Sequence, residues 1–157
     1  MKRVYWIFVL VFLLFPLPFL AQDYPQVLLN NKKPFEGVLR GKSSATDLQI
    51  YILQVKKKNL STYLITGYSL VEQTKRDFVG EVSFSPAKGN GKLKTQYGQF
   101  ELKEKGEDEH SGSFKGRLIF TYHKEKNSQS IKNPFLQFVG RWTSSSGKLQ
   151  FTTQFKN

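Results

Sequence analysis

Alternation of apolar and polar residues near the end of the chain constrains the fold more than any other feature of the sequence. In the stretch FVGRWTSSSGKLQFTTQF (138–155), apolar or small residues occupy every second position on both sides of the Ser/Gly segment 144–147. This pattern is typical of a β-hairpin with one buried face. Gly140, two residues before Trp142, leaves room for a large ring or a closely approaching strand. We therefore predict that this hairpin closes a small antiparallel barrel.

The N-terminal segment has the composition of an export signal. Lys2 and Arg3 precede an almost wholly apolar run, Val4–Ala21, and the polar chain begins at Gln22. A charged start, an apolar run and a small residue at its end are typical of a secretory signal peptide. The run is also close to the minimum length for crossing a bilayer, so a retained membrane anchor is the alternative. Two prolines near its end favour cleavage, and we expect an exported protein, periplasmic or extracellular, without residues 1–21.

The rest of the chain has the length of one domain. It contains no cysteine, which excludes disulfides and a lipid-bearing cysteine after the signal. We therefore expect a soluble domain that is held together by a hydrophobic core. An irregular lead-in, residues 22–33, is expected before a barrel domain at residues 34–157.

The barrel domain divides into extended segments separated by turn-forming residues. No window of adequate length after the signal shows apolar residues at helical spacing, so helix should be minor. Short strands at regular intervals with turn signals between them predict a sandwich or a barrel, and closure of a barrel removes exposed strand edges. We predict an all-β, about eight-stranded, antiparallel up-and-down barrel. The expected strands are 35–41, 47–55, 61–72, 77–85, 92–105, 112–123, 135–143 and 148–155.

A local motif, Phe-x-Gly, recurs in four of these segments, at residues 35–37, 78–80, 114–116 and 138–140. Its unequal spacing is not that of a solenoid repeat. A ring beside a residue without a side chain suits points where strands bend around a narrow interior. We expect buried phenylalanine rings and close strand contacts at these places.

Two further glycines interrupt expected strands. Gly67 lies in mid-strand and predicts a bulge or a close approach of another strand. Gly98 is expected to shift the apolar phase of its strand, from Leu93 and Tyr97 before it to Phe100 and Leu102 after it.

The C-terminal hairpin also carries a resemblance. Gly140-Arg141-Trp142, the Ser/Gly turn and the Leu-x-Phe-x-Thr-x-Phe run resemble the G-x-W strand and hairpin of avidin-like and lipocalin-like barrels, and of small exported barrel proteins of Gram-negative bacteria. Lipocalins carry G-x-W on their first strand and usually contain cysteine, whereas here the motif lies near the C-terminus and cysteine is absent. The resemblance covers this hairpin and the strand count. It implies Trp142 as a ring at the barrel floor and no other ligand-binding residue.

A binding interior is the function that the pattern favours. The polar or aromatic residues that share the apolar face by parity are the candidate ligand contacts: Tyr63, Ser69, Tyr97, Tyr122 and Thr153, together with Trp142. Aromatic walls with a few hydroxyls suit a small, mostly apolar ligand, and we expect a cavity lined by Tyr97, Tyr122 and Trp142. A packed interior is the alternative, because eight-stranded barrels are often just wide enough for their own side chains.

The charge of the chain suggests a second kind of partner. Lys and Arg total 24 against 12 Asp and Glu, which creates a positive field. Such a field attracts anionic polymers and lipid surfaces, although solubility alone also accounts for it. An exported protein seldom meets nucleic acid, so anionic polysaccharide or phospholipid is the expected partner of a basic face. The basic residues expected on outward faces are Lys92, Lys94, Lys115, Arg117 and Arg141.

The sequence gives little support for catalysis or a metal site. His110 follows Glu107, Asp108 and Glu109 at a spacing that matches no defined metal loop, and no serine lies in a G-x-S-x-G context. An enzyme would need two or more ionisable residues converging in the interior, which the parity does not supply. We expect a non-catalytic binding protein with no cofactor and no metal. An envelope-surface protein that binds an anionic polymer or a protein partner, and a small barrel enzyme, are the alternatives.

Overall fold

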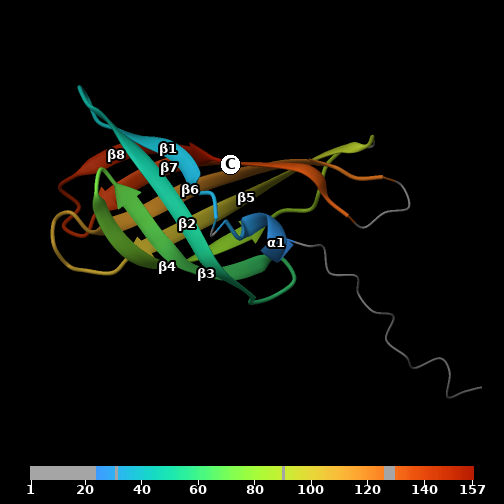
Figure 1. Cartoon of the computed structure of the whole chain (residues 1–157), viewed down its shortest axis with the longest axis horizontal. Helices are drawn as coiled ribbons and strands as arrows, with labels where there is room; N and C mark the ends of the chain where they lie inside the picture. The colour runs from blue at the N-terminus through green and yellow to red at the C-terminus, as the bar shows by residue number, and fades with distance from the viewer. Residues whose placement is uncertain (1–23, 31, 90, 126–129) are drawn as a thin grey trace, which may run out of the picture.

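The chain folds into a closed antiparallel barrel of eight strands, in which sequence neighbours pair and β1 pairs with β8 (Figure 1). The computed structural model describes residues 24–30, 32–89, 91–125 and 130–157, so the expected signal segment 1–21 lies outside the described residues. The strands are β1 (Phe35–Arg40), β2 (Ala45–Lys57), β3 (Thr62–Val71), β4 (Thr74–Phe84), β5 (Leu93–Glu104), β6 (Gly112–His123), β7 (Lys132–Ser144) and β8 (Gln150–Lys156). The predicted fold class and up-and-down strand order are confirmed.

One end of the barrel is closed by a short helix, α1 (Tyr24–Leu28), where an irregular segment was expected. Tyr24 and Leu28, four residues apart and therefore on one face of the helix, are both buried. Asn30, two residues after α1, is fixed to β2. Its Oδ1 accepts a hydrogen bond from the Ile52 amide, and its Nδ2 donates one to the Ile50 carbonyl at 2.9 Å. A helix of five residues is too short to show a periodic pattern, which explains why the sequence did not predict it. No helix in the described part of the chain has the length and apolar character needed to cross a membrane.

Aromatic rings fill the barrel in two layers. Next to α1, Tyr24 stacks on Phe84 with ring centroids 4.6 Å apart, and Phe120 stacks on Tyr122 at 4.6 Å. The middle layer is a cluster of five fully buried phenylalanines in mutual ring contact: Phe35, Phe100, Phe114, Phe138 and Phe155. The middle of the barrel is therefore packed by its own side chains.

Glycines bring strands close together where the sequence motif predicted it. All four phenylalanines of the Phe-x-Gly motifs are buried. A Cβ added at Gly140 would lie 2.2 Å from the Lys115 carbonyl oxygen and 2.8 Å from the Gly116 Cα, so β6 and β7 touch at this glycine pair. At Gly67 an added Cβ would lie 1.8 Å from the Tyr51 carbonyl oxygen, and the register of β2 shifts beside it. Both features expected at Gly67 occur, with the irregularity on the partner strand.

The predicted phase shift at Gly98 is wrong. β5 keeps one parity from Gln96 to Glu104, with every second residue buried, while Tyr97 lies on the outer face and is 50% exposed. Gln96 is tolerated inside because it accepts a hydrogen bond from Tyr24 Oη at 2.8 Å and donates one to the Ser85 carbonyl at 2.9 Å. Gln96 and Glu104, near the two ends of β5, thus point inward although they are polar, because each is hydrogen-bonded. A prediction from hydrophobicity alone assigns such residues to the outer face.

Candidate functional site

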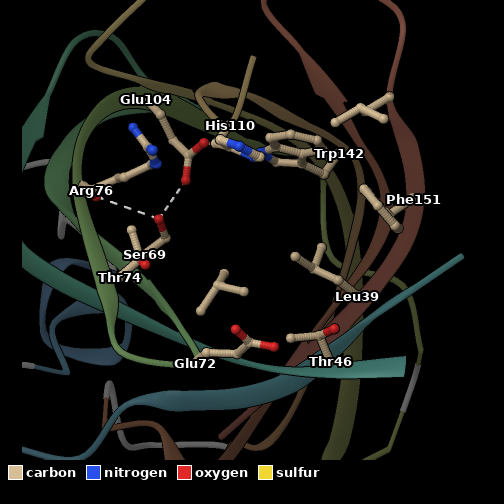
Figure 2. A pocket seen from close by; sticks show the side chains of 12 residues that line it. Leu39, Thr46, Ser69, Glu72, Thr74, Arg76, Glu104, His110, Trp142 and Phe151 are labelled. Atoms are coloured by element: carbon tan, nitrogen blue, oxygen red, sulfur yellow. Dashed lines mark hydrogen bonds between the residues drawn. The ribbon is translucent and has the colours of Figure 1, made fainter. Parts of the chain in front are cut away.

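The end of the barrel opposite α1 contains a pocket with a volume of about 470 Å³ (Figure 2). Pockets that hold small molecules typically measure 300–1,000 Å³. β5 ends at Glu104, whose buried side chain lines this pocket. The pocket is lined by Leu39, Thr46, Ser69, Val71, Glu72, Thr74, Arg76, Glu104, His110, Trp142, Leu149 and Phe151.

The pocket has one polar and one apolar wall. Figure 2 shows Ser69, Arg76 and Glu104 together on the side formed by β3, β4 and β5. Leu39 and Phe151, from β1 and β8, lie on the opposite side. A molecule in this space would meet hydrogen-bonding groups on one side and hydrocarbon on the other.

Glu104 is the centre of the polar wall. Its side chain is only 4% exposed. Its Oε2 accepts hydrogen bonds from Trp142 Nε1 and from the Gly112 amide, both at 2.9 Å, and its Oε1 is bonded to Ser69 Oγ. The carboxyl group thereby links β3, β6 and β7 to β5 at the base of the pocket. This network fixes the orientation of the Trp142 ring in the pocket wall.

Burial raises the pKa of Glu104 above its usual range, and hydrogen bonds from Ser69, Trp142 and Gly112 partly oppose this rise. The hydrogen-bond geometry also accommodates the protonated form. Ser69 Oγ lies near two acceptors, Glu104 Oε1 and the Arg76 carbonyl oxygen at 3.4 Å, but carries one proton. If Glu104 is protonated on Oε1, it donates to Ser69, and Ser69 donates to the carbonyl of Arg76. The neutral carboxyl group therefore satisfies every atom of the network.

Arg76 ties the polar wall to the loop between β5 and β6. Its Nη1 lies 3.0 Å from Asp108 Oδ2. Asp108 Oδ1 in turn accepts from the His110 amide, so the acidic segment that the sequence places beside His110 forms a tight loop at the pocket mouth. Across the described residues, no group of three or more His, Asp and Glu side chains is placed to hold a metal ion.

The candidate ligand contacts from the sequence separate into three places. Ser69 and Trp142 line the pocket. Tyr63 and Tyr122 are buried as predicted, but they lie in the aromatic layer at the α1 end. Tyr97 lies on the outer face, so the expected cavity lined by Tyr97, Tyr122 and Trp142 does not form.

Thr153, also assigned to the interior by parity, is buried just below the pocket. It pairs with Leu39 on β1 and with Gly140 on β7. It lies two residues after Phe151 on β8, toward the middle of the barrel. Its Oγ1 is a buried side-chain atom without a hydrogen-bond partner among the described residues. Thr153 does not line the pocket itself, although its register partner Leu39 does.

The sequence did not predict the ionisable residues of the pocket. We expected no convergence of ionisable groups in the interior, but Glu72, Arg76, Glu104 and His110 all line this pocket. Glu104 could have been found, because it shares the parity of Phe100 and Leu102 within the predicted strand 92–105. Arg76 had no such signal, since it lies just outside a predicted strand.

The predicted basic face divides into two parts. Lys115 and Arg141 lie opposite each other on β6 and β7, and Arg117 is exposed on the same outer wall. Lys92 and Lys94 lie at the α1 end, where Lys94 shares the inward parity of Gln96 and its Nζ donates to the Gly89 carbonyl. Along β6, Lys115 is about 23 Å from Tyr122, the register partner of Lys94. These residues do not form one continuous stripe.

No protein-family model matches the chain, and neither a curated protein nor a solved structure shows significant similarity to it. The closed eight-stranded barrel is therefore established by the structure itself.

Proposed function

We propose that the protein binds a small, mostly apolar ligand in the open end of the barrel and does not transform it. The observation that carries this proposal is the pocket of about 470 Å³ with its two unlike walls, which opens above a fully packed aromatic layer. The apolar wall would take the hydrocarbon part of the ligand. The polar wall, at Arg76, would take a single hydrogen-bonding head group.

The bonding of Glu104 favours binding over catalysis. A general acid or base must exchange its proton with a substrate. Both oxygens of Glu104 are already engaged, by Ser69 on one side and by Trp142 and Gly112 on the other. The carboxyl group is therefore suited to hold the wall in place and to tune its polarity.

We also propose that the protein is exported, because Val4–Ala21 has the composition of a signal segment. The finer resemblance to avidin-like or lipocalin-like barrels stays a hypothesis. What supports it is the closed eight-stranded antiparallel barrel, with Trp142 in the wall of the pocket.

Ligand titration of the full chain tests the proposal. Decanol, decanoate and decylamine share one hydrocarbon chain and differ in the charge of the head group. Trp142 reports binding through its fluorescence, because its indole lines the pocket and donates to Glu104. We expect saturable binding of at least one of the three probes, and the preferred head group identifies the chemistry of the polar wall. Native mass spectrometry of protein from its own source should show a retained small molecule.

Two matched leucine variants separate pocket binding from surface adsorption. Leu149→Asn changes the pocket wall, whereas Leu64→Asn changes a partly exposed leucine on the outer face of β3. The first should weaken binding about tenfold or more, in line with the loss of apolar contact, and the second should leave it within about twofold. Equal effects of the two variants, or no saturable binding of any probe, would contradict the proposal.

A further inference from the structure

The α1 end of the barrel carries a concentration of lysine that the pocket does not use. At this end β2 and β6 end, and β5 and β7 begin (Figure 1). The connection between β2 and β3 and the connection between β4 and β5 also lie here. Of the acidic groups near this end, Glu81 and Glu125 pair with Lys58 and Lys132, and Glu36 lies at the start of β1. Exposed lysines at this end include Lys56, Lys57, Lys58, Lys88, Lys92 and Lys132.

Most of the lysines at this end make no ion pair with another residue that the structure describes. Lys56, Lys57 and Lys88 are exposed and make no ion pair with a described residue. The opposite end is different, because Glu72, Asp108 and other carboxylates surround the pocket mouth there. The molecule therefore has a positive end and a mixed end.

Exposed leucines accompany the lysines. Leu60, in the connection between β2 and β3, is 81% exposed, and Leu93, at the start of β5, is 52% exposed. Leu29, directly after α1, is 38% exposed. Lysine side chains interspersed with protruding aliphatic ones are suited to a membrane interface, where the lysines meet anionic head groups and the leucines reach the acyl boundary. A soluble polyanion would use the lysines but would give no reason for the leucines.

The course of the chain leads to the same end. The apolar run Val4–Ala21 is separated from Tyr24 only by Gln22 and Asp23. The three residue steps from Ala21 to Tyr24 span at most about 11 Å, so the apolar run ends within that distance of α1. If this run is retained as an anchor in a bilayer, the α1 end is the part of the barrel that must lie beside that bilayer; after cleavage, the lysines and leucines alone would hold it there.

We propose that the α1 end of the barrel docks on the surface of a bilayer that contains anionic lipid, with the pocket facing away from the membrane. The docking surface consists of the exposed lysines above together with Leu60 and Leu93. The proposal does not depend on a ligand in the pocket, since the two sites lie at opposite ends of the barrel.

Single cysteines can test the orientation, because the chain has no cysteine of its own. Ser61→Cys places a fluorescent label at the α1 end and Ser43→Cys places the same label at the pocket end; both serines are exposed. The full-length labelled chain is mixed with, or reconstituted into, vesicles of phosphatidylcholine alone or with phosphatidylglycerol. Vesicles carry a nitroxide quencher near the head groups. We expect stronger quenching at position 61 than at position 43, and an increase when anionic lipid is present.

Two charge-matched triple variants test the role of the lysines. The first variant combines Lys56→Gln, Lys57→Gln and Lys88→Gln and should weaken partitioning onto anionic vesicles roughly a hundredfold. Each lysine near such a surface contributes about 1 kcal/mol of attraction, and three together correspond to about that fold-change. The control, Lys42→Gln, Lys105→Gln and Lys148→Gln, removes the same charge from the pocket end and should change partitioning less than about threefold. If residues 4–21 anchor the chain, every variant is bound to the vesicle and partitioning does not distinguish them. Quenching at position 61 is then compared between the variants.

Three outcomes would overturn the proposal. The first is equal or stronger quenching at position 43, which would mean that the pocket end faces the bilayer. The second is equal loss of partitioning, or of quenching at position 61, in both triple variants, which would show a response to net charge alone. The third is tight, salt-sensitive binding to a soluble polyanion with no preference for anionic vesicles, which would replace lipid by a polymer partner.

Discussion

Glu104 offers the sharpest test of the structure, because one buried side chain joins four strands. Glu104→Ala removes the acceptor for Trp142 Nε1 and the Gly112 amide, and the partner of Ser69 Oγ. The Ser69 hydroxyl can turn to the Arg76 carbonyl, which is already 3.4 Å away. Two buried donors are then left without a partner, and each costs about 1–3 kcal/mol. Water entering from the pocket offsets part of this loss, so we expect the free energy of unfolding to fall by about 2–5 kcal/mol.

Glu104→Gln is the matched control. The amide oxygen of glutamine can accept from Trp142 and Gly112, and its amide nitrogen can donate to Ser69, as the protonated carboxyl group does. We expect this variant to stay within about 1 kcal/mol of the wild type at acidic pH, where Glu104 holds its proton.

The two proteins should diverge as the pH rises. Since the pKa of Glu104 is raised by burial, the folded protein holds this proton more tightly than the unfolded chain does. Its stabilising effect is complete below the ordinary glutamate value of 4.5 and is lost as the pH rises through the raised native pKa. Glutamine cannot ionise, so Glu104→Gln should gain stability relative to the wild type over that interval.

Urea unfolding at a series of pH values, followed by circular dichroism and by Trp142 fluorescence, measures all three proteins. The reasoning is refuted if Glu104→Ala costs less than about 1 kcal/mol, or if the alanine and glutamine variants are equally destabilised. A loss of stability by Glu104→Gln relative to the wild type as the pH rises would also contradict the assigned direction of the pKa shift.

Three further predictions concern the packing of the barrel. Asn30→Ala should cost about 1–3 kcal/mol and speed hydrogen exchange at the Ile52 amide, whereas Asn30→Asp, which keeps the acceptor oxygen, should cost less. Gly140→Ala should cost at least about 2 kcal/mol in urea unfolding, because its Cβ would lie 2.2 Å from the Lys115 carbonyl, while Gly91→Ala, with no atom within 4 Å, should be nearly neutral. Tyr24→Phe should cost about 1 kcal/mol in thermal unfolding through loss of the bond to Gln96, and Tyr24→Ala considerably more through loss of stacking on Phe84.

The strands could be predicted from the sequence because their signal is local. Alternation around Trp142 and Phe155 is visible within a few residues, and the Ser/Gly turn between them sets the hairpin register. The same reasoning placed Tyr63 and Tyr122 inside. It could not place them at the α1 end, because parity states which face a side chain occupies and carries no information about its height along the barrel axis.

The pocket was harder to predict because its essential residues are polar. Hydrophobic patterning treats an inward Glu104 or Gln96 as a break in phase, and that is how Tyr97 came to be assigned to the interior. Each buried polar group is stabilised by partners that are distant in the sequence, such as Trp142 for Glu104 and Tyr24 for Gln96. No local pattern contains such pairs, so a buried carboxyl group has to be found from parity alone or from the structure.

The middle layer of phenylalanines determines how the two ends can act. Phe100, Phe138 and Phe155 are fully buried and in ring contact, which leaves no passage along the barrel axis. A ligand in the proposed pocket must therefore enter and leave through the mouth near Glu72 and His110. If the α1 end rests on a membrane, that mouth points to the aqueous side, where exchange of ligand does not require the protein to leave the bilayer. Docking and ligand binding can thus be lost separately, because the residues proposed for each lie on opposite sides of the packed phenylalanine layer.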